Sequence, residues 1–69
     1  MKRRDKKLIE QAASNIKHHR MKKGWSQEKL QERTGLSIAR YESGKKDMTL
    51  TTLGILSKHL SIESYELLK

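Results

Sequence analysis

Residues 24–44 read GWSQEKLQERTGLSIARYESG, and this stretch decides the fold. Ser26 carries a hydroxyl that can accept a backbone N–H in a first helical turn, which predicts a helix over 27–33. Gly35 ends that helix, because glycine readily adopts the left-handed backbone that often follows a helix. A second, very short helix is expected over 38–43. The stretch therefore predicts two short helices joined by a tight turn.

Helical patterns also flank this stretch on both sides. Before it, apolar residues recur at steps of three and four, which predicts one amphipathic helix over about 6–22. These residues are Leu8, Ile9, Ala12, Ala13 and Ile16. After it, Thr49 can cap a helix over 50–60. Four leucines are expected on one face of that helix: Leu50, Leu53, Leu56 and Leu60. A last turn or two is expected over 64–68, and no segment alternates as a strand would, so the fold class is all-α.

Composition and charge limit the possible functions. The chain has 69 residues with 16 Lys and Arg against 8 Asp and Glu, a net charge of +8. Residues 1–23 hold nine of the cations and two of the anions, so this segment alone carries +7. Nucleic-acid phosphate is the commonest partner of such a local excess, and the alternative is a solvated tail that binds nothing. The absence of cysteine excludes disulfides and cysteine-based zinc sites, which leaves self-association as the expected support for a thin core.

Several short motifs in this order resemble the Xre/Cro/CI helix-turn-helix family of phage-repressor-like regulators. They are Ile16-x3-Arg20, Gly24-Trp25-Ser26-Gln27-Glu28-x-Leu30, Gly35-Leu36-Ser37, Ile38-Ala39-Arg40-Tyr41-Glu42-Ser43-Gly44, and the leucine pattern after Thr49. The resemblance covers residues 12–68. It implies a five-helix, lambda-repressor-like DNA-binding domain over 8–69, preceded by a basic N-terminal arm over 1–7. It further implies a sequence-specific transcriptional regulator that binds double-stranded DNA as a homodimer on a palindromic operator. Small members of this family include phage repressors, restriction–modification controller proteins and antitoxins.

The DNA-binding residues follow partly from the resemblance and partly from position. The resemblance implies that Gln27 contacts a phosphate and that Arg40 reads bases from the third helix. Seven residues are predicted to bind DNA: Arg3, Arg4, Gln27, Ser37, Arg40, Lys45 and Lys46. Of these, Lys45 and Lys46 lie in the loop after the third helix, and Arg3 and Arg4 could reach a minor groove as an arm. Ser37 is expected to act first as a helix cap.

Two further groups of residues are expected to hold the structure together. The family places an ion pair where this chain has Arg20 and Glu42, and a guanidinium can hold a carboxylate bidentately. Tyr65, Leu67 and Leu68 could belong to the core or to a dimer interface, and we favour the interface. Trp25 and Tyr41 are expected in the core.

The sequence departs from the family pattern at two places. Six residues separate Gly35 from Glu42, where the family has nine, and the missing three would form the first turn of the recognition helix. Either the third helix is truncated, or residues are omitted between Ser37 and Ile38. We favour the omission. The second departure is Gln31, because the family has a small residue there, so the amide must find a partner or turn outward.

Other functions are less well supported. The main alternative is an antitoxin or adaptor of the same fold whose ligand is another protein, and a truncated third helix would favour it. An enzyme is not expected, because the chain lacks a glycine-rich phosphate loop and a cysteine nucleophile. No metal or cofactor is expected, since His18, His19 and His59 lack ligand spacing. No apolar run is long enough to span a membrane. A cytoplasmic location is expected, because no apolar stretch of the signal-peptide kind follows the basic N-terminus and the absence of cysteine is consistent with a reducing compartment.

Overall fold

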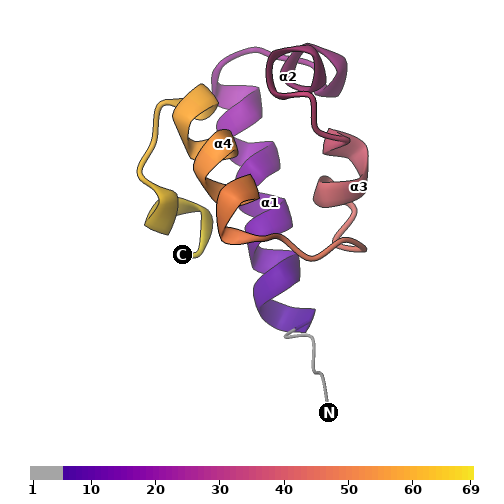
Figure 1. Ribbon diagram of the computed structural model, residues 1–69, viewed down its shortest axis with the longest axis vertical. Coiled ribbons are helices and arrows are strands. Elements are labelled where there is room, and N and C mark those ends of the chain that lie inside the picture. Colours follow the sequence, from indigo (N-terminus) through magenta and orange to yellow (C-terminus); the bar gives the residue numbers. More distant parts are fainter. Residues whose placement is uncertain (1–5) are drawn as a thin grey trace.

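The computed structural model describes residues 6–69, which fold into four α-helices and one short 3-10 helix (Figure 1). The elements are α1 (Lys6–Lys22), α2 (Gln27–Thr34), α3 (Ile38–Glu42), α4 (Leu50–Leu60) and the 3-10 helix η1 (Ser64–Leu67). The long α1 runs through the molecule, with α3 on one side of it and α4 and η1 on the other. The predicted all-α class is therefore confirmed, and the fifth helix is a single 3-10 turn.

The core lies where α1, α2, α3, α4 and η1 meet. Its buried members are Ile16, Leu30, Ile38, Tyr41, Leu53, Leu56, Leu60 and Leu67, with Trp25, Leu36, Met48 and Ile62 packed at its margin. Tyr41 is thus a core residue as predicted, while Trp25 is half-buried. The expectation that Leu50 shares the buried face of α4 is wrong. Leu50 is 87% exposed, because it is the first residue of α4 and lies beyond the edge of the core.

Side-chain caps fix the start of two helices. Ser26 Oγ accepts a 3.0 Å hydrogen bond from Lys29 N at the start of α2. Thr49 Oγ1 accepts a 3.1 Å hydrogen bond from Thr52 N at the start of α4. Both caps confirm the sequence prediction, and each satisfies a backbone N–H that the helix itself leaves unpaired.

The turn between α2 and α3 depends on Gly35. Its φ is +75°, in the left-handed region, and its N–H donates a 2.7 Å hydrogen bond to Gln31 O. This geometry ends α2 as predicted. Gln31 itself is exposed, so its amide turns outward, which was one of the two expected outcomes.

The third helix is short, and the chain enters it without a break. The Ser37 carbonyl oxygen accepts hydrogen bonds from Arg40 N at 3.1 Å and from Tyr41 N at 3.3 Å. The three residues that the family has at this point are absent, and α3 spans only Ile38–Glu42. The omission of residues between Ser37 and Ile38 stays a prediction. The expected cap is also absent, because the Ser37 side chain makes no capping hydrogen bond.

Candidate nucleic-acid interface

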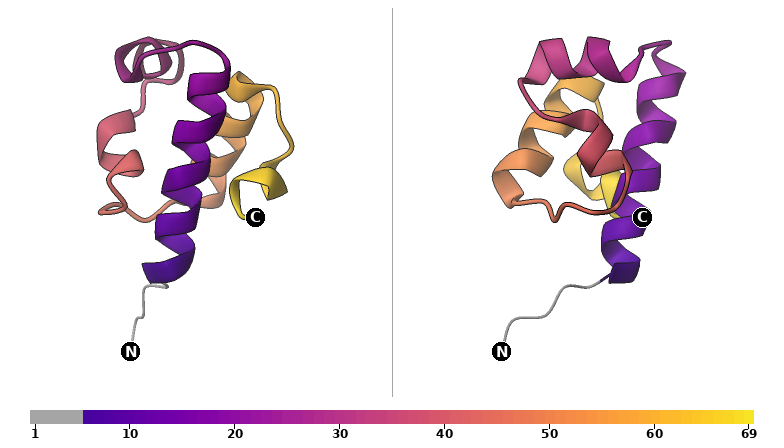
Figure 2. Two further views of the ribbon diagram at one scale, coloured as in Figure 1. Left: turned by 180° about the vertical axis from the view of Figure 1, so that it is seen from behind. Right: turned by 90° about the vertical axis from the view of Figure 1, so that its right-hand side faces the viewer.

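Helix α3, the second helix of the motif, is exposed to solvent along one side. α3 packs on α1 and α2 through Ile38 and Tyr41, which are buried. Its other face carries Ala39 and Arg40, and both are exposed. The right-hand view of Figure 2 looks directly at α3, with α2 above it and α1 beside it. The only long polar side chain on the outer face of α3 is therefore that of Arg40.

An ion pair at the C-terminal end of α3 fixes the position of this helix against α1. Arg20 Nε donates to Glu42 Oε2 at 2.6 Å, and Arg20 Nη2 donates to Glu42 Oε1 at 3.0 Å. A third bond runs from Arg20 Nη1 to the carbonyl oxygen of Trp25 at 2.6 Å. The two charged side chains are only 9% and 4% exposed. The pair predicted from the sequence is present in bidentate form.

The electrostatics of this pair follow from its geometry. The hydrogen bond from Arg20 to Glu42 raises the pKa of the guanidinium above its usual value, against the opposing effect of burial. Removal of one partner would leave the other charge buried without compensation, at a cost of about 3–5 kcal/mol. The pair therefore constrains the orientation of α3 relative to α1.

Gln27 connects this pair to the start of α2. Its Nε2 donates a 3.0 Å hydrogen bond to Glu42 Oε1, so Glu42 accepts hydrogen bonds from both α1 and α2. The sequence analysis assigned Gln27 a phosphate contact alone and missed this role. Gln27 begins α2 and Glu42 ends α3, so the two residues lie at the outer ends of the motif and their spacing in the sequence gives no signal of this contact. Gln27 remains exposed, so its side chain is accessible from solvent.

The structure brings most of the predicted DNA-binding residues to one side of the molecule. Gln27 begins α2, Ser37 precedes α3, Arg40 lies on α3, and Lys45 and Lys46 follow it. All five are exposed. The ammonium of Lys46 lies 5.7 Å from the centre of the Tyr41 ring, a cation–π contact that holds it beside α3. The remaining two, Arg3 and Arg4, lie outside the described residues.

The residues predicted for a dimer interface separate into two groups. Tyr65 is 60% exposed and Leu68 is 40% exposed. Leu67 is fully buried in the protein's own core, so its assignment to an interface is wrong. The reason is that η1 packs on α1 and α4, and Asn15 Nδ2 anchors the segment by donating to the Leu67 carbonyl oxygen at 3.0 Å.

An apolar hollow of about 370 Å³ lies between the first half of α1, the start of α4 and Leu68, and Asp47 and Met48 of the loop after α3 also line it. Its lining includes Leu8 of α1, Leu50 of α4 and Leu68, all of them exposed. Single exposed leucines are common on protein surfaces, whereas three of them around one hollow form a contiguous apolar patch. Leu68 makes this surface continuous with the exposed part of the predicted interface.

Two other features bear on binding and on the membrane prediction. Over residues 6–69, no group of three His, Cys, Asp or Glu side chains is arranged to hold a metal ion. Within the same residues, no helix is both long enough and apolar enough to cross a bilayer.

Comparisons with known proteins agree with this geometry. The family model described as "Helix-turn-helix" matches residues 16–67. Among solved structures, the chain is similar to the crystal structure of hypothetical transcription factor NHTF from Neisseria, with a TM-score of 0.86 and 27% sequence identity. That match covers 100% of this chain and 84% of the other. No curated protein matches the sequence.

Proposed function

Because the chain belongs to the helix-turn-helix family, whose model spans residues 16–67, we propose that it is a transcriptional regulator that binds double-stranded DNA. One observation carries the proposal: Arg40 stands exposed on α3, and exposed Gln27, which is hydrogen-bonded to Glu42, lies at the same end of α3 that Lys45 and Lys46 follow. The name of the similar Neisseria protein, a hypothetical transcription factor, supports the same function.

Recognition would divide between the phosphates and the bases. Gln27, Lys45 and Lys46 contact the backbone and supply affinity, since amides and ammonium groups bind phosphate oxygens. Arg40 enters the major groove, where a guanidinium can donate two hydrogen bonds to the O6 and N7 of guanine. Ser37, whose hydroxyl makes no capping bond, contributes a secondary contact from the start of α3.

The proposed regulator acts as a homodimer on a palindromic operator. A five-residue α3 exposes few side chains, so a second copy is needed to read a longer site. The surface around Tyr65 and Leu68, extended by Leu8 and Leu50, would form the interface, and η1 lies on the other side of α1 from α3 (Figure 1). Dimerisation there would leave both copies of α3 free for DNA. The proposed activity is binding in the cytoplasm, without catalysis.

The short α3 also supports a second candidate, an antitoxin or adaptor whose main ligand is another protein. Such a function calls for an apolar surface separate from the dimer interface. The apolar hollow includes Leu68 and is therefore continuous with the proposed interface, which favours the regulator. A stable complex with a different protein, formed in preference to DNA, would support the adaptor instead.

Selection of bound duplexes from a random pool tests the proposal. The expected product is a palindrome with two short half-sites, which would show specificity and two-fold symmetry together. Affinity for that duplex should fall steeply with salt, with a slope of about −0.9 for each phosphate neutralised. Recovery of no preferred sequence, with binding that does not change with salt, would contradict the proposal.

A further inference from the structure

Two lysines of α1 lie beside the end of α3, outside the helix-turn-helix motif. Lys17 lines a shallow hollow together with Ser43 and Gly44, which follow α3. Lys6 lines a neighbouring hollow together with Gly44 and Lys45. Neither lysine was among the residues predicted to bind DNA, because the sequence showed only that the first third of the chain is basic.

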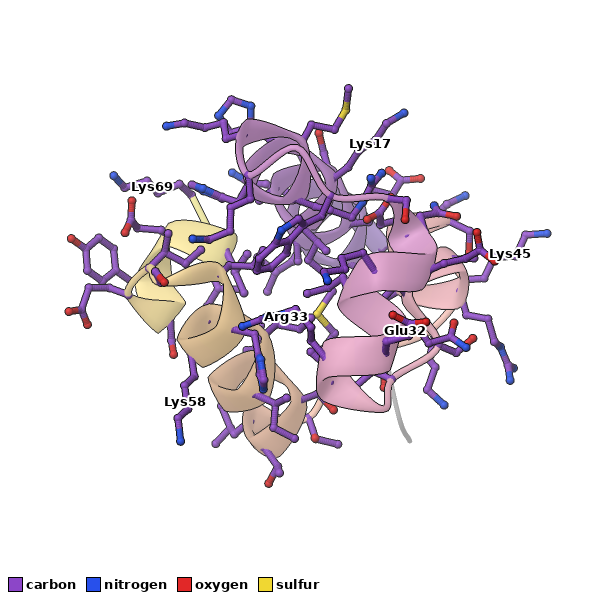
Figure 3. The ribbon with its side chains drawn as sticks, turned by 90° about the horizontal axis from the view of Figure 1, so that it is seen from above. Lys17, Glu32, Arg33, Lys45, Lys58 and Lys69 are labelled. Carbon is purple, nitrogen blue, oxygen red and sulfur yellow. The ribbon has the colours of Figure 1, made fainter. Side chains whose placement is uncertain are left out.

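The spacing of Lys6 and Lys17 explains why both face α3. Eleven residues make slightly more than three full turns of an α-helix, so the two side chains share one face and lie about 16.5 Å apart along the axis. Figure 3 shows that Lys17 and Lys45 lie toward one side of the molecule, whereas Lys58 and Lys69 lie toward the other. Part of the positive charge of α1 therefore lies on the side of the molecule that carries the helix-turn-helix motif.

The charges on this flank are predominantly positive. Glu10 lies between the two lysines, and its Cγ would be 3.6 Å from a Cβ built on Gly44. The other carboxylate near Lys17 is that of Glu42, which is already neutralised by Arg20. Lys6 and Lys17 therefore outnumber Glu10, the one carboxylate beside them that Arg20 does not pair with. A polyanion that docks on α3 would meet a positive surface on α1.

We propose that Lys17 and Lys6 bind backbone phosphates of the same DNA duplex that α3 reads, so that the contact surface extends onto α1. This inference rests on the proposed DNA-binding function. The ligand is the sugar-phosphate backbone, and the contacts carry no sequence information. They compensate for the short α3, which exposes only Ala39 and Arg40 on its outer face, by adding affinity from outside the motif.

Charge-neutral variants with a matched control test the inference. Lys6→Gln removes one positive charge beside Gly44 and Lys45, Lys17→Gln removes one from the same side, and Lys58→Gln removes one from the opposite side. All three lysines are exposed, so the fold should be retained, which thermal unfolding monitored by circular dichroism checks. Binding is measured by fluorescence anisotropy with two labelled duplexes, one recovered by selection and one of mixed sequence, over roughly 50 to 200 mM salt.

Lys17→Gln should weaken binding to both duplexes by the same factor and reduce the salt slope by about 0.9, as expected for the loss of one phosphate contact. Lys6→Gln should act likewise, and Lys58→Gln should leave the slope unchanged. If Lys17→Gln and Lys6→Gln behave like Lys58→Gln while the wild-type protein binds with a steep slope, the inference is wrong and the proposed function stands. If the wild-type protein binds neither duplex, both are wrong.

Discussion

Gln27 and Glu42 are joined by a hydrogen bond of 3.0 Å between Nε2 and Oε1, although they belong to different helices of the motif. The same carboxylate oxygen also accepts a hydrogen bond from Arg20 at 3.0 Å. Glu42 therefore ties together the end of α1, the start of α2 and the end of α3. The residue proposed to contact phosphate and the helix proposed to read bases are held in a fixed relation through one side chain.

Replacement of Glu42 should be strongly destabilising. Glu42→Ala leaves Arg20 buried without a counter-charge and should lower the free energy of unfolding by about 3–5 kcal/mol. Urea denaturation followed by circular dichroism measures the change. Glu32→Ala is the matched control, since Glu32 is exposed on α2 and its loss should change stability by less than about 0.5 kcal/mol. A loss below about 1 kcal/mol for Glu42→Ala would show that the pair does not constrain α3 as described.

Two glycine replacements should have opposite effects on stability. Gly35→Ala forces a Cβ into the left-handed region and should cost about 1–2 kcal/mol, although no atom crowds the new group. Gly54→Ala, in the middle of α4 and also uncrowded, should stabilise the protein by about 0.5–1 kcal/mol. Thermal unfolding of the two variants beside the wild type measures both. Equal effects of the same sign would contradict the assigned backbone conformations.

Local signals in the sequence predicted most of the fold. The capping hydroxyls of Ser26 and Thr49, and the left-handed turn at Gly35, act through neighbouring backbone atoms, so α2 and α4 begin where expected and α2 ends within one residue of the expected position. The errors concern residues whose environment is set by distant segments. Nothing in the local pattern separates buried Leu67 from exposed Leu68, because Leu67 is buried by α1 and α4.

The candidate site could be predicted only in part, because some of its contacts depend on how helices distant in the sequence pack together. Arg20 and Glu42 were paired from the family resemblance, and the structure has that pair. The link from Gln27 to Glu42 depends on how α2 meets α3, which the spacing alone does not fix. Likewise, the sequence shows that α1 is basic but not that Lys17 lies beside Gly44. Both contacts depend on how the helices pack against one another, which the sequence alone does not show.

A charge placed in the proposed interface should prevent dimer formation. Leu68→Glu puts a carboxylate into an apolar surface that a second copy would bury, where an unpaired charge is costly. Sedimentation equilibrium should show a dimer for the wild type and a monomer for this variant. Met21→Glu is the control, because Met21 is also an exposed apolar residue but lies on α1 outside the hollow. A wild-type monomer at all concentrations would overturn the homodimer.

Acid should weaken the fold through His19. Burial lowers the pKa of His19 below its usual 6.5, and the neighbouring His18 lowers it further, with smaller effects of Lys22 and Lys69 and an opposing effect of Glu66. The neutral form is favoured in the folded state, so this contribution to stability is complete above pH 6.5 and is lost as the pH falls through the folded pKa. Urea denaturation of the wild type across this range should show the decline, and His19→Gln should reduce it. An unchanged decline in the variant would assign it to other groups.

The central claim is that duplex DNA binds to the side of the molecule that carries α3. Titration of isotope-labelled protein with the selected duplex, followed through backbone amide resonances, tests it most directly. The account predicts the largest shifts at Gln27, Ser37, Arg40 and the 43–46 loop, with little change along the exposed face of α4. Shifts concentrated on α4 and η1, with α3 unaffected, would contradict it.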